Sequence, residues 1–184
     1  MVKKYGVAFG RVQPLHFAHQ YIINEIMLDG LQPVWVLGSS NDNRDREKNP
    51  LTYDARKFLI SLVYPFNEVI TVKSYDYSSW DTWLTEIFEA LSNKGIPIEE
   101  CVFYYNNKEV DRYASFTFQG ILYKDEFYTK IFEVLKLAIK EIEFVKRSDL
   151  YIDANARDIR HDLETNKHLL DARIYKQLKV WGWS

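Results

Sequence analysis

Short apolar runs alternate with helix-like segments along the chain up to Tyr105. The runs predicted to be strands are Tyr5–Phe9, Pro33–Leu37, Glu68–Lys73 and Cys101–Tyr105. Helices are predicted between them over Phe17–Leu28, from Thr52 to about Tyr64, and from Ser79 to Lys94. This alternation is typical of a parallel sheet with right-handed crossovers. The sequence therefore predicts an α/β fold: a Rossmann-like open parallel sheet with helices on both faces.

The last third of the sequence is less regular. It predicts an amphipathic helix over Asp125–Ile139, a fifth strand over Ile142–Val145, a short helix capped by Asn155 or Asp153, and a terminal helix from Asp171 to Val180. The stretch from about 123 to 140 looks like an insertion. We expect a single domain over residues 1–184, with a small C-terminal helical appendage from about 156 to 184.

The composition limits which cellular compartment and which classes of partner we expect for the protein. The 24 Lys and Arg nearly balance the 26 Asp and Glu, so the net charge of −2 gives no global attraction to nucleic acid or to an anionic membrane. One cysteine, Cys101, cannot form an intramolecular disulfide. No window reaches the roughly 18 apolar residues of a membrane helix. We expect a cytoplasmic protein with no nucleic-acid and no membrane partner.

The turn between the first strand and the first helix carries the string GRVQPLHFAH, Gly10 to His19. In open α/β sheets, ligands bind at the carboxyl ends of strands, and a helix N-terminus attracts phosphate. His16 and His19 are three residues apart, so both can face one phosphate chain while Arg11 approaches from the loop. The alternative is that they are ordinary polar residues at a helix start. The sequence has no GxxxxGK[ST] and no GxGxxG motif, which argues against a P-loop ATPase and a standard dinucleotide-binding dehydrogenase.

Three further segments follow this string. They are VLGSSNDNRDREKNPLTYDAR from Val36 to Arg56, Trp83 within DYSSWDTWL, and NARDIR from Asn155 to Arg160. In this order, the four segments resemble the HxGH nucleotidylyltransferase superfamily, and within it the nicotinamide mononucleotide (NMN) adenylyltransferases of the archaeal type. The likeness is strongest to the adenylyltransferase half of enzymes that also carry a Nudix hydrolase domain. We expect no Nudix domain in this chain.

Two positions depart from the family pattern. Ala18 stands where HxGH has its glycine, which in this superfamily lies against the nucleotide, so the added methyl group tightens or shifts the base pocket. Arg157 stands where the C-terminal [ST]-x-T-x-I-R motif has threonine, so a long cation replaces a small hydroxyl donor. Arg157 can still reach a phosphate, but with a different local geometry.

The resemblance implies a nucleotidylyltransferase fold and transfer of the adenylyl group of ATP to NMN, with NAD and pyrophosphate as products. It also implies Mg²⁺ bound mainly through the ATP phosphates, with no metal site in the protein itself. The chemistry supports the same interpretation, because a phosphate monoester is mostly a dianion at pH 7 and needs no general base to attack phosphorus. Catalysis then depends on positioning and charge neutralisation. Nicotinate mononucleotide as the acceptor and assembly into a homo-oligomer are left open.

The resemblance also implies roles for cationic residues. It assigns His16 and His19 to the ATP phosphates, and Arg11 and Arg160 to phosphate clamping. Lys48 is assigned to a loop contact just before the N-P pair, a role for which Arg44 and Arg46 compete. A solvated charged loop is the alternative interpretation of these last three residues.

Other positions are expected to contact the substrates. Trp83 is predicted to stack on the nicotinamide ring, with Trp80 as its competitor and core packing as the alternative. Asn41 is expected to hydrogen-bond the nicotinamide amide or the adenosine. Further substrate-binding positions are Gly10, Gln13, Ala18, Ser39, Arg157 and Ile159.

Other functions fit some of the same residues. Pantetheine-phosphate adenylyltransferases and cytidylyltransferases share the HxGH motif, but the GRVQP string, the N-P-L-T segment and Trp83 favour a nicotinamide substrate. A non-catalytic nucleotide-binding regulator would keep the pocket and lose turnover, with Ala18 and Arg157 as its degenerate positions. A metal site at His16 and His19 has no third ligand with clear spacing, because His161 and His168 lie on remote segments.

Overall fold

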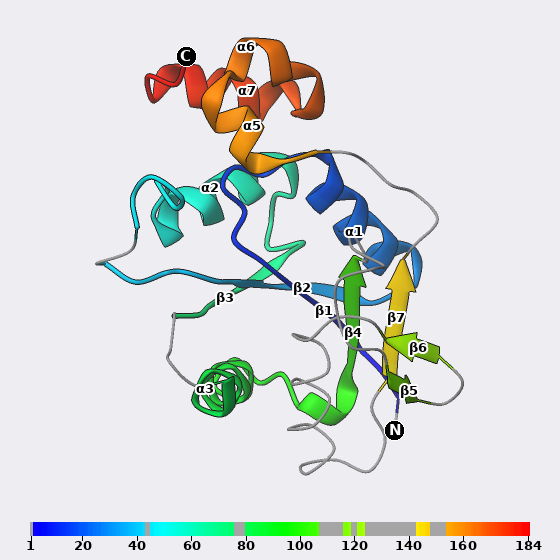
Figure 1. The fold of residues 1–184 in the computed structure, drawn as a ribbon. Helices are drawn as coiled ribbons and strands as arrows, with labels where there is room; N and C mark the ends of the chain where they lie inside the picture. Colours follow the sequence, from blue (N-terminus) through cyan, green and yellow to red (C-terminus); the bar gives the residue numbers. More distant parts are fainter. Residues whose placement is uncertain are drawn as a thin grey trace.

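A five-stranded parallel sheet forms the framework of the protein (Figure 1). The structure is a computed structural model and describes residues 2–42, 45–75, 80–106, 116–118, 121–123, 143–147 and 154–184. Its strands are β1 (Tyr5–Gly10), β2 (Gln32–Leu37), β3 (Ile70–Lys73), β4 (Cys101–Asn106) and β7 (Glu143–Arg147). They lie in the order β3-β2-β1-β4-β7, and every neighbouring pair is parallel. The predicted open parallel sheet is confirmed.

Helices cover both faces of this sheet, as predicted (Figure 1). The helices α1 (Phe17–Leu28) and α2 (Tyr53–Val63) lie on one side, and α3 (Trp80–Ser92) lies on the other. The C-terminal helices, which lie beside α2, are α5 (Ala156–His161), α6 (Leu163–Asn166) and α7 (Ala172–Val180). Short 3₁₀ helices span Ile98–Glu100 and Lys167–Leu169. None of the helices in the described ranges has the length and apolar character needed to cross a bilayer.

Three helix starts follow from side-chain caps that the sequence predicts. The Oγ1 of Thr52 accepts a hydrogen bond from the Ala55 N–H (3.2 Å) at the start of α2. Asn155 caps α5 through its Oδ1, and Asp171 caps α7 in the same way. Each cap satisfies a main-chain donor that the first helical turn leaves without a helical partner, which stabilises the helix by about 1 kcal/mol.

Other elements differ from the sequence prediction. An antiparallel pair, β5 (Phe116–Phe118) and β6 (Ile121–Tyr123), was not predicted. Strand β3 begins at Ile70 rather than Glu68, because the Glu68 N–H donates to the Pro65 carbonyl in a turn. The fifth strand is confirmed as β7. The predicted helix over Asp125–Ile139 and the cap at Ser79 lie outside the described residues.

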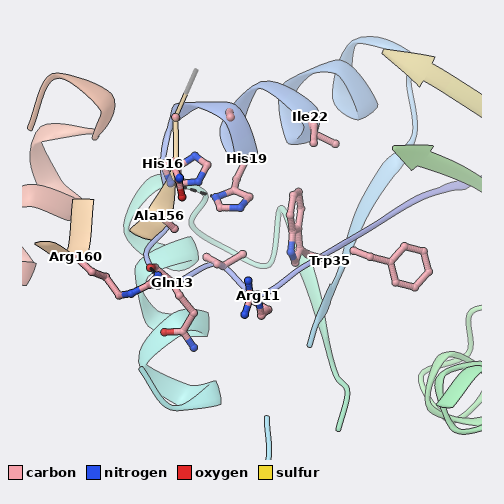
Figure 2. Close-up of a pocket in the computed structure, with 13 residues that line it drawn as sticks. Arg11, Gln13, His16, His19, Ile22, Trp35, Ala156 and Arg160 are labelled. Atoms are coloured by element: carbon pink, nitrogen blue, oxygen red, sulfur yellow. Dashed lines mark hydrogen bonds between the residues drawn. The ribbon is translucent and has the colours of Figure 1, made fainter. Parts of the chain in front are cut away.

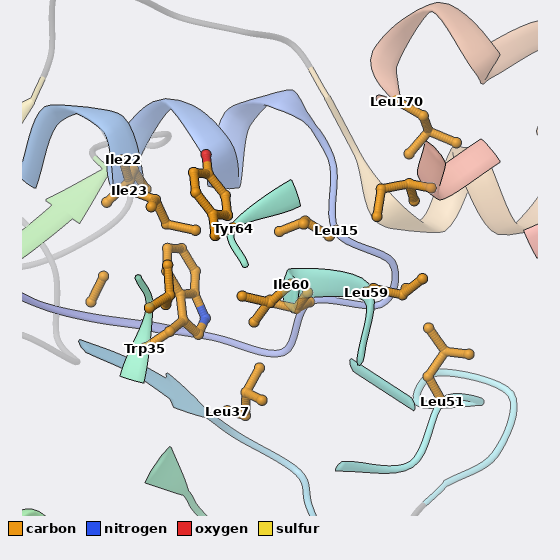
Figure 3. Close-up of a cluster of buried hydrophobic side chains, with 14 of the residues drawn as sticks. Leu15, Ile22, Ile23, Trp35, Leu37, Leu51, Leu59, Ile60, Tyr64 and Leu170 are labelled. Atoms are coloured by element: carbon orange, nitrogen blue, oxygen red, sulfur yellow. The ribbon is translucent and has the colours of Figure 1, made fainter. Parts of the chain in front are cut away.

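Two apolar cores pack on the opposite faces of the sheet. The larger core, shown in part in Figure 3, joins β1 and β2 to α1, α2 and the C-terminal helices, with the fully buried Trp35 among its members. The smaller core joins the other face to α3. Helix α1 approaches β1 closely at Gly6, where a Cβ atom would collide with Ile26. This close packing holds the last turn of α1 against the beginning of β1.

Candidate functional site

A pocket of about 300 Å³ lies at the carboxyl end of β1 and the N-terminus of α1 (Figure 2). This volume is at the small end of the range for small-molecule sites. Its lining comes from β1, the loop after it, α1, β2 and the start of α5. The lining residues are Phe9, Arg11, Val12, Gln13, His16, Ala18, His19, Ile22, Trp35, Ala154, Asn155, Ala156 and Arg160. Six predicted site residues therefore meet here: Arg11, Gln13, His16, Ala18, His19 and Arg160.

The two histidines lie side by side at the start of α1 (Figure 2). His16 is the N-cap residue, and its main-chain N–H donates to Nδ1 of His19 at 3.3 Å. The ring centroids are 3.7 Å apart, and the His19 ring meets Trp35 edge-on at 5.4 Å. Because Nδ1 of His19 accepts a hydrogen bond, a neutral His19 carries its proton on Nε2. His19 is thus held as an Nε2–H donor at a helix N-terminus, where the helix dipole favours an anion.

Arginines supply the positive charge of the pocket. Arg160 reaches from α5, and its Nη1 donates to the Gln13 carbonyl at 2.8 Å. Burial lowers the pKa of Arg160, and the neighbouring charges of Arg11 and Arg157 lower it further. A lowered pKa means that the charged guanidinium of Arg160 is less stable here than in water. A bound anion would stabilise this charge, and no carboxylate occurs among the described residues that line the pocket.

The side chain of Gln13 holds the site loop in place. It is 2% exposed; its Nε2 donates to the Leu51 carbonyl at 3.0 Å and its Oε1 accepts from the Leu51 N–H at 2.9 Å. These bonds tie the loop after β1 to the segment that leads into α2. The Gln13 amide is therefore engaged with the main chain. The preceding residue, Val12, has a φ of 51°, an unusual conformation for a β-branched residue.

Four other predicted site residues lie outside the pocket lining. Lys48 is exposed and pairs with Asp45 at 3.4 Å. Arg157 is exposed on the first turn of α5, whereas Ile159 is fully buried in the larger core. Gly10 closes β1, and its carbonyl lies 3.4 Å from Nε1 of Trp35. A Cβ atom at Gly10 would press on the Trp35 ring, so glycine permits this contact.

The remaining predicted residues lie after β2 and on α3. Ser39 is 8% exposed with a φ of 50°, and Asn41 is half-buried. Trp83 donates from Nε1 to the Ser74 Oγ at 2.7 Å, and its ring centroid is 5.9 Å from that of Phe9. Phe9 lines the pocket, so Trp83 is one side chain away from it. Arg46 is exposed; Arg44 and the Trp80 side chain lie outside what the structure describes.

Sequence reasoning missed the apolar wall of the pocket. Ile22 comes one turn after Ala18 on α1, and Trp35 lies opposite Ala8 in the β1–β2 register. Their sequence pattern signals only core packing, because residues that line a pocket and residues that fill a core have the same periodicity. Within the described part of the chain, no group of three or more His, Cys, Asp or Glu is arranged to hold a metal ion.

Comparisons with known proteins bear on the fold. No protein-family model and no curated protein sequence matches the chain. Among solved structures, a bifunctional NMN adenylyltransferase/ADP-ribose pyrophosphatase from Francisella tularensis, complexed with AMP and a manganese ion, is 18% identical with a TM-score of 0.67. The match covers 98% of this chain and 49% of that one.

Two further structures are similar. The NadR protein in complex with NAD and AMP-PNP is 17% identical with a TM-score of 0.65, over 95% of this chain and 46% of that one. The Plasmodium falciparum nicotinic acid mononucleotide adenylyltransferase, complexed with NaAD, is 9% identical with a TM-score of 0.57. The match covers 98% of this chain and 96% of that one. The chain thus spans about half the length of the first two proteins. It has the Rossmann-like nucleotidyltransferase fold that these nucleotide-binding proteins share.

Proposed function

We propose that the protein transfers the adenylyl group of ATP to NMN, forming NAD and releasing pyrophosphate. The observation that carries this proposal is the meeting of His16, His19, Arg11 and Arg160 around one pocket at the N-terminus of α1. Four donor side chains in such a place suit a polyphosphate. The shared fold supports adenylyl transfer as the reaction class, and the GRVQP string and Trp83 support a nicotinamide acceptor.

In the proposed reaction, a phosphate oxygen of the mononucleotide attacks the α-phosphorus of ATP. A P–O bond forms, the bond from the α-phosphorus to the bridging oxygen breaks, and pyrophosphate leaves with that oxygen and its electrons. The nucleophile is already mostly a dianion at pH 7, so no general base is needed. The charge that develops on the phosphates would be stabilised by the Nε2–H of His19 and the imidazole of His16, together with the guanidinium groups of Arg11 and Arg160.

Mg²⁺ is proposed to enter as part of the substrate, bound to the ATP phosphates. The described lining of the pocket offers imidazoles, guanidinium groups and the amides of Gln13 and Asn155, but no carboxylate, whereas Mg²⁺ prefers oxygen ligands. The two amide oxygens already accept main-chain hydrogen bonds. The ATP phosphate oxygens would supply those ligands. The ion would then neutralise the leaving pyrophosphate alongside the arginines.

Further contacts are proposed at the edge of the pocket. Arg157 would reach the outer phosphates from the exposed side of α5, and Lys48 would approach from the loop after β2. Trp83 would stack on the nicotinamide from α3, next to Phe9. Ser39 and Asn41 follow β2 and would contact the mononucleotide. The shape of the site around these contacts would depend on Gly10, Gln13, Ala18 and Ile159.

A panel of acceptors tests the proposed function. The purified protein is incubated with ATP, Mg²⁺ and, separately, NMN, nicotinate mononucleotide or phosphopantetheine, and the products are separated by chromatography. Adenylylation of either mononucleotide and not of phosphopantetheine supports the proposal. Adenylylation of phosphopantetheine alone would make another nucleotidylyltransferase the better assignment. Binding of ATP with no product from any acceptor would favour a regulator that keeps the pocket and has lost turnover.

A further inference from the structure

A fully buried arginine lies outside the pocket lining. Arg56, in the first turns of α2, has an exposed fraction of 0%. Burying a guanidinium group without hydrogen-bond acceptors is strongly unfavourable, so the groups that accept its hydrogen bonds indicate the role of Arg56. They are main-chain and hydroxyl oxygens from the loops at the carboxyl end of the sheet.

Each of the five guanidinium N–H groups has an acceptor. Nε donates to the Thr52 carbonyl at 3.3 Å. Nη1 donates to the carbonyls of Arg11 at 2.7 Å and Gly38 at 2.6 Å. Nη2 reaches the Ser39 carbonyl at 3.5 Å and the Ser40 Oγ at 2.8 Å. One side chain therefore joins three segments: the loop after β1, the loop after β2 and the start of α2.

This arrangement fixes the main chain on either side of the Arg11 side chain. The Arg11 carbonyl is bound by Arg56, and one residue further on, after Val12, Gln13 is bound to Leu51. On the loop after β2, Gly38 lies near the Cγ of Arg11, and the Gly38 carbonyl is bound by the same Nη1 of Arg56. Arg56 thus sets the position of the loop after β1, which carries Arg11, relative to the loop after β2, which the Arg11 side chain contacts.

The conformation of Ser39 fits the same role. Its φ of 50° lies in the left-handed region, which is unfavourable for a residue other than glycine. In this conformation Ser39 and its two neighbours direct a carbonyl, a carbonyl and a hydroxyl oxygen to one guanidinium group. The bonds to Arg56 compensate for the unfavourable backbone of this loop.

We propose that Arg56 is a positioning residue for the anion site: through its five hydrogen bonds, it holds the Arg11 guanidinium where it meets the phosphates. This inference rests on the proposed function insofar as that function requires a polyphosphate in the pocket. Lysine cannot reproduce the role, because its ammonium has three donors on one atom instead of five in a planar fork. Arg56 itself does not touch the ligand.

A double-mutant cycle on anion affinity tests this inference. The dissociation constants of ATP and of inorganic pyrophosphate, each with Mg²⁺, are measured by calorimetry for the full chain and for R56K, R11A and the double variant. We expect each single change to raise both constants about tenfold or more, and the double variant to stay within about twofold of R11A, because both changes remove the same contact. Unchanged constants in R56K, or effects that multiply in the double variant, would overturn the inference.

Two further variants separate positioning from general loosening of α2. T52A removes the cap hydroxyl that accepts from Ala55 and keeps the Thr52 carbonyl that accepts from Arg56, so it should lower the melting temperature and leave both constants within about twofold. S40A removes a single acceptor of Arg56, and it keeps the inference testable if R56K does not fold. We expect S40A to raise both constants about threefold, a change that R11A should abolish.

The possible outcomes distinguish this inference from the proposed function. Anion binding that depends on Arg56 and Arg11 as predicted, with no dinucleotide formed from either mononucleotide, would contradict the proposed function alone. Dinucleotide formation with ATP affinity that does not respond to R56K and S40A would contradict the inference alone. A wild-type protein that binds neither ATP nor pyrophosphate would overturn both.

Discussion

Nη1 of Arg160 donates a 2.8 Å hydrogen bond to the main-chain oxygen of Gln13, a residue 147 positions earlier in the chain. The bond joins the C-terminal helical segment to the loop that precedes α1 (Figure 2). The C-terminal segment is therefore part of the candidate site, and the pocket needs both ends of the described chain to form.

This relationship gives a prediction for two neighbouring arginines. R160A removes both the cation and its bond to Gln13, so we expect it to raise the KM for ATP about tenfold or more, as the loss of a hydrogen bond to a charged group would. R160K should have an intermediate effect, because one ammonium is less able to serve the carbonyl and a phosphate together. R157A, on the exposed face of α5, should change the KM by about threefold or less. Steady-state kinetics with ATP as the varied substrate would decide, and a larger effect of R157A would reverse the two roles.

The hydrogen bond between the two histidines gives a prediction for His19. In H19N, an amide oxygen can still accept from the His16 N–H, but the donor at Nε2 is lost. We expect kcat to fall roughly 10²–10³-fold, as when one preorganised donor is removed, with the free energy of unfolding changed by less than about 1 kcal/mol. H168A, which alters an exposed histidine near the Thr165 carbonyl, serves as the control and should change neither quantity. Near-wild-type kcat in H19N would remove His19 from the chemistry.

Kinetics can separate the two roles considered for Trp83, stacking on the nicotinamide and packing against Phe9. If its ring stacks on the nicotinamide, W83A should raise the KM for NMN about tenfold and leave the KM for ATP nearly unchanged, with W83F recovering part of the loss. The S74A variant removes the acceptor of the indole N–H and keeps the ring, so it reports on anchoring alone. Nicotinate mononucleotide should be affected as much as NMN, because stacking is nearly insensitive to an amide or a carboxylate on the ring. An unchanged KM for NMN in W83A would make packing against Phe9 the role of Trp83.

The single cysteine provides a pH-dependent prediction. Cys101 is 1% exposed at the start of β4, and burial raises the pKa of its thiol to about 12. The folded protein should therefore react with a thiol reagent such as DTNB at pH 8 only after unfolding. Because the folded-state pKa is the higher one, the folded thiol keeps its proton, and its contribution to stability is lost as the pH rises from about 9 towards 12. The C101A variant should show a smaller loss of stability over that range; rapid labelling of native protein would contradict the burial of Cys101.

Much of the fold could be predicted from residues that act locally. Thr52, Asn155 and Asp171 cap helices with their own side chains, so their positions predict where α2, α5 and α7 begin. The apolar runs of β1 and β2 predict buried parallel strands, because a strand covered on both faces is apolar along its whole length. The antiparallel pair β5–β6 was missed, because three-residue strands are too short to show a period.

The candidate site was predictable where its residues belong to segments that resemble a family motif, which for Arg160 is the segment NARDIR. Arg11, His16 and His19 lie within one turn and the helix that follows it, and the structure brings them together with Arg160. Arg56 could not be assigned from the sequence, because its role depends on three carbonyls and a hydroxyl from distant loops. Main-chain acceptors of that kind leave no residue-type pattern to recognise.

Formation of NAD from ATP, Mg²⁺ and NMN by the purified protein tests the central claim most directly. NAD and pyrophosphate should appear in equal amounts in the wild-type protein, and the H16A/H19A double variant, purified in parallel, should show at least about 100-fold slower formation of both. That parallel sample excludes a contaminating enzyme as the source. Folded wild-type protein that forms neither NAD nor pyrophosphate, and no product from nicotinate mononucleotide, would contradict the account.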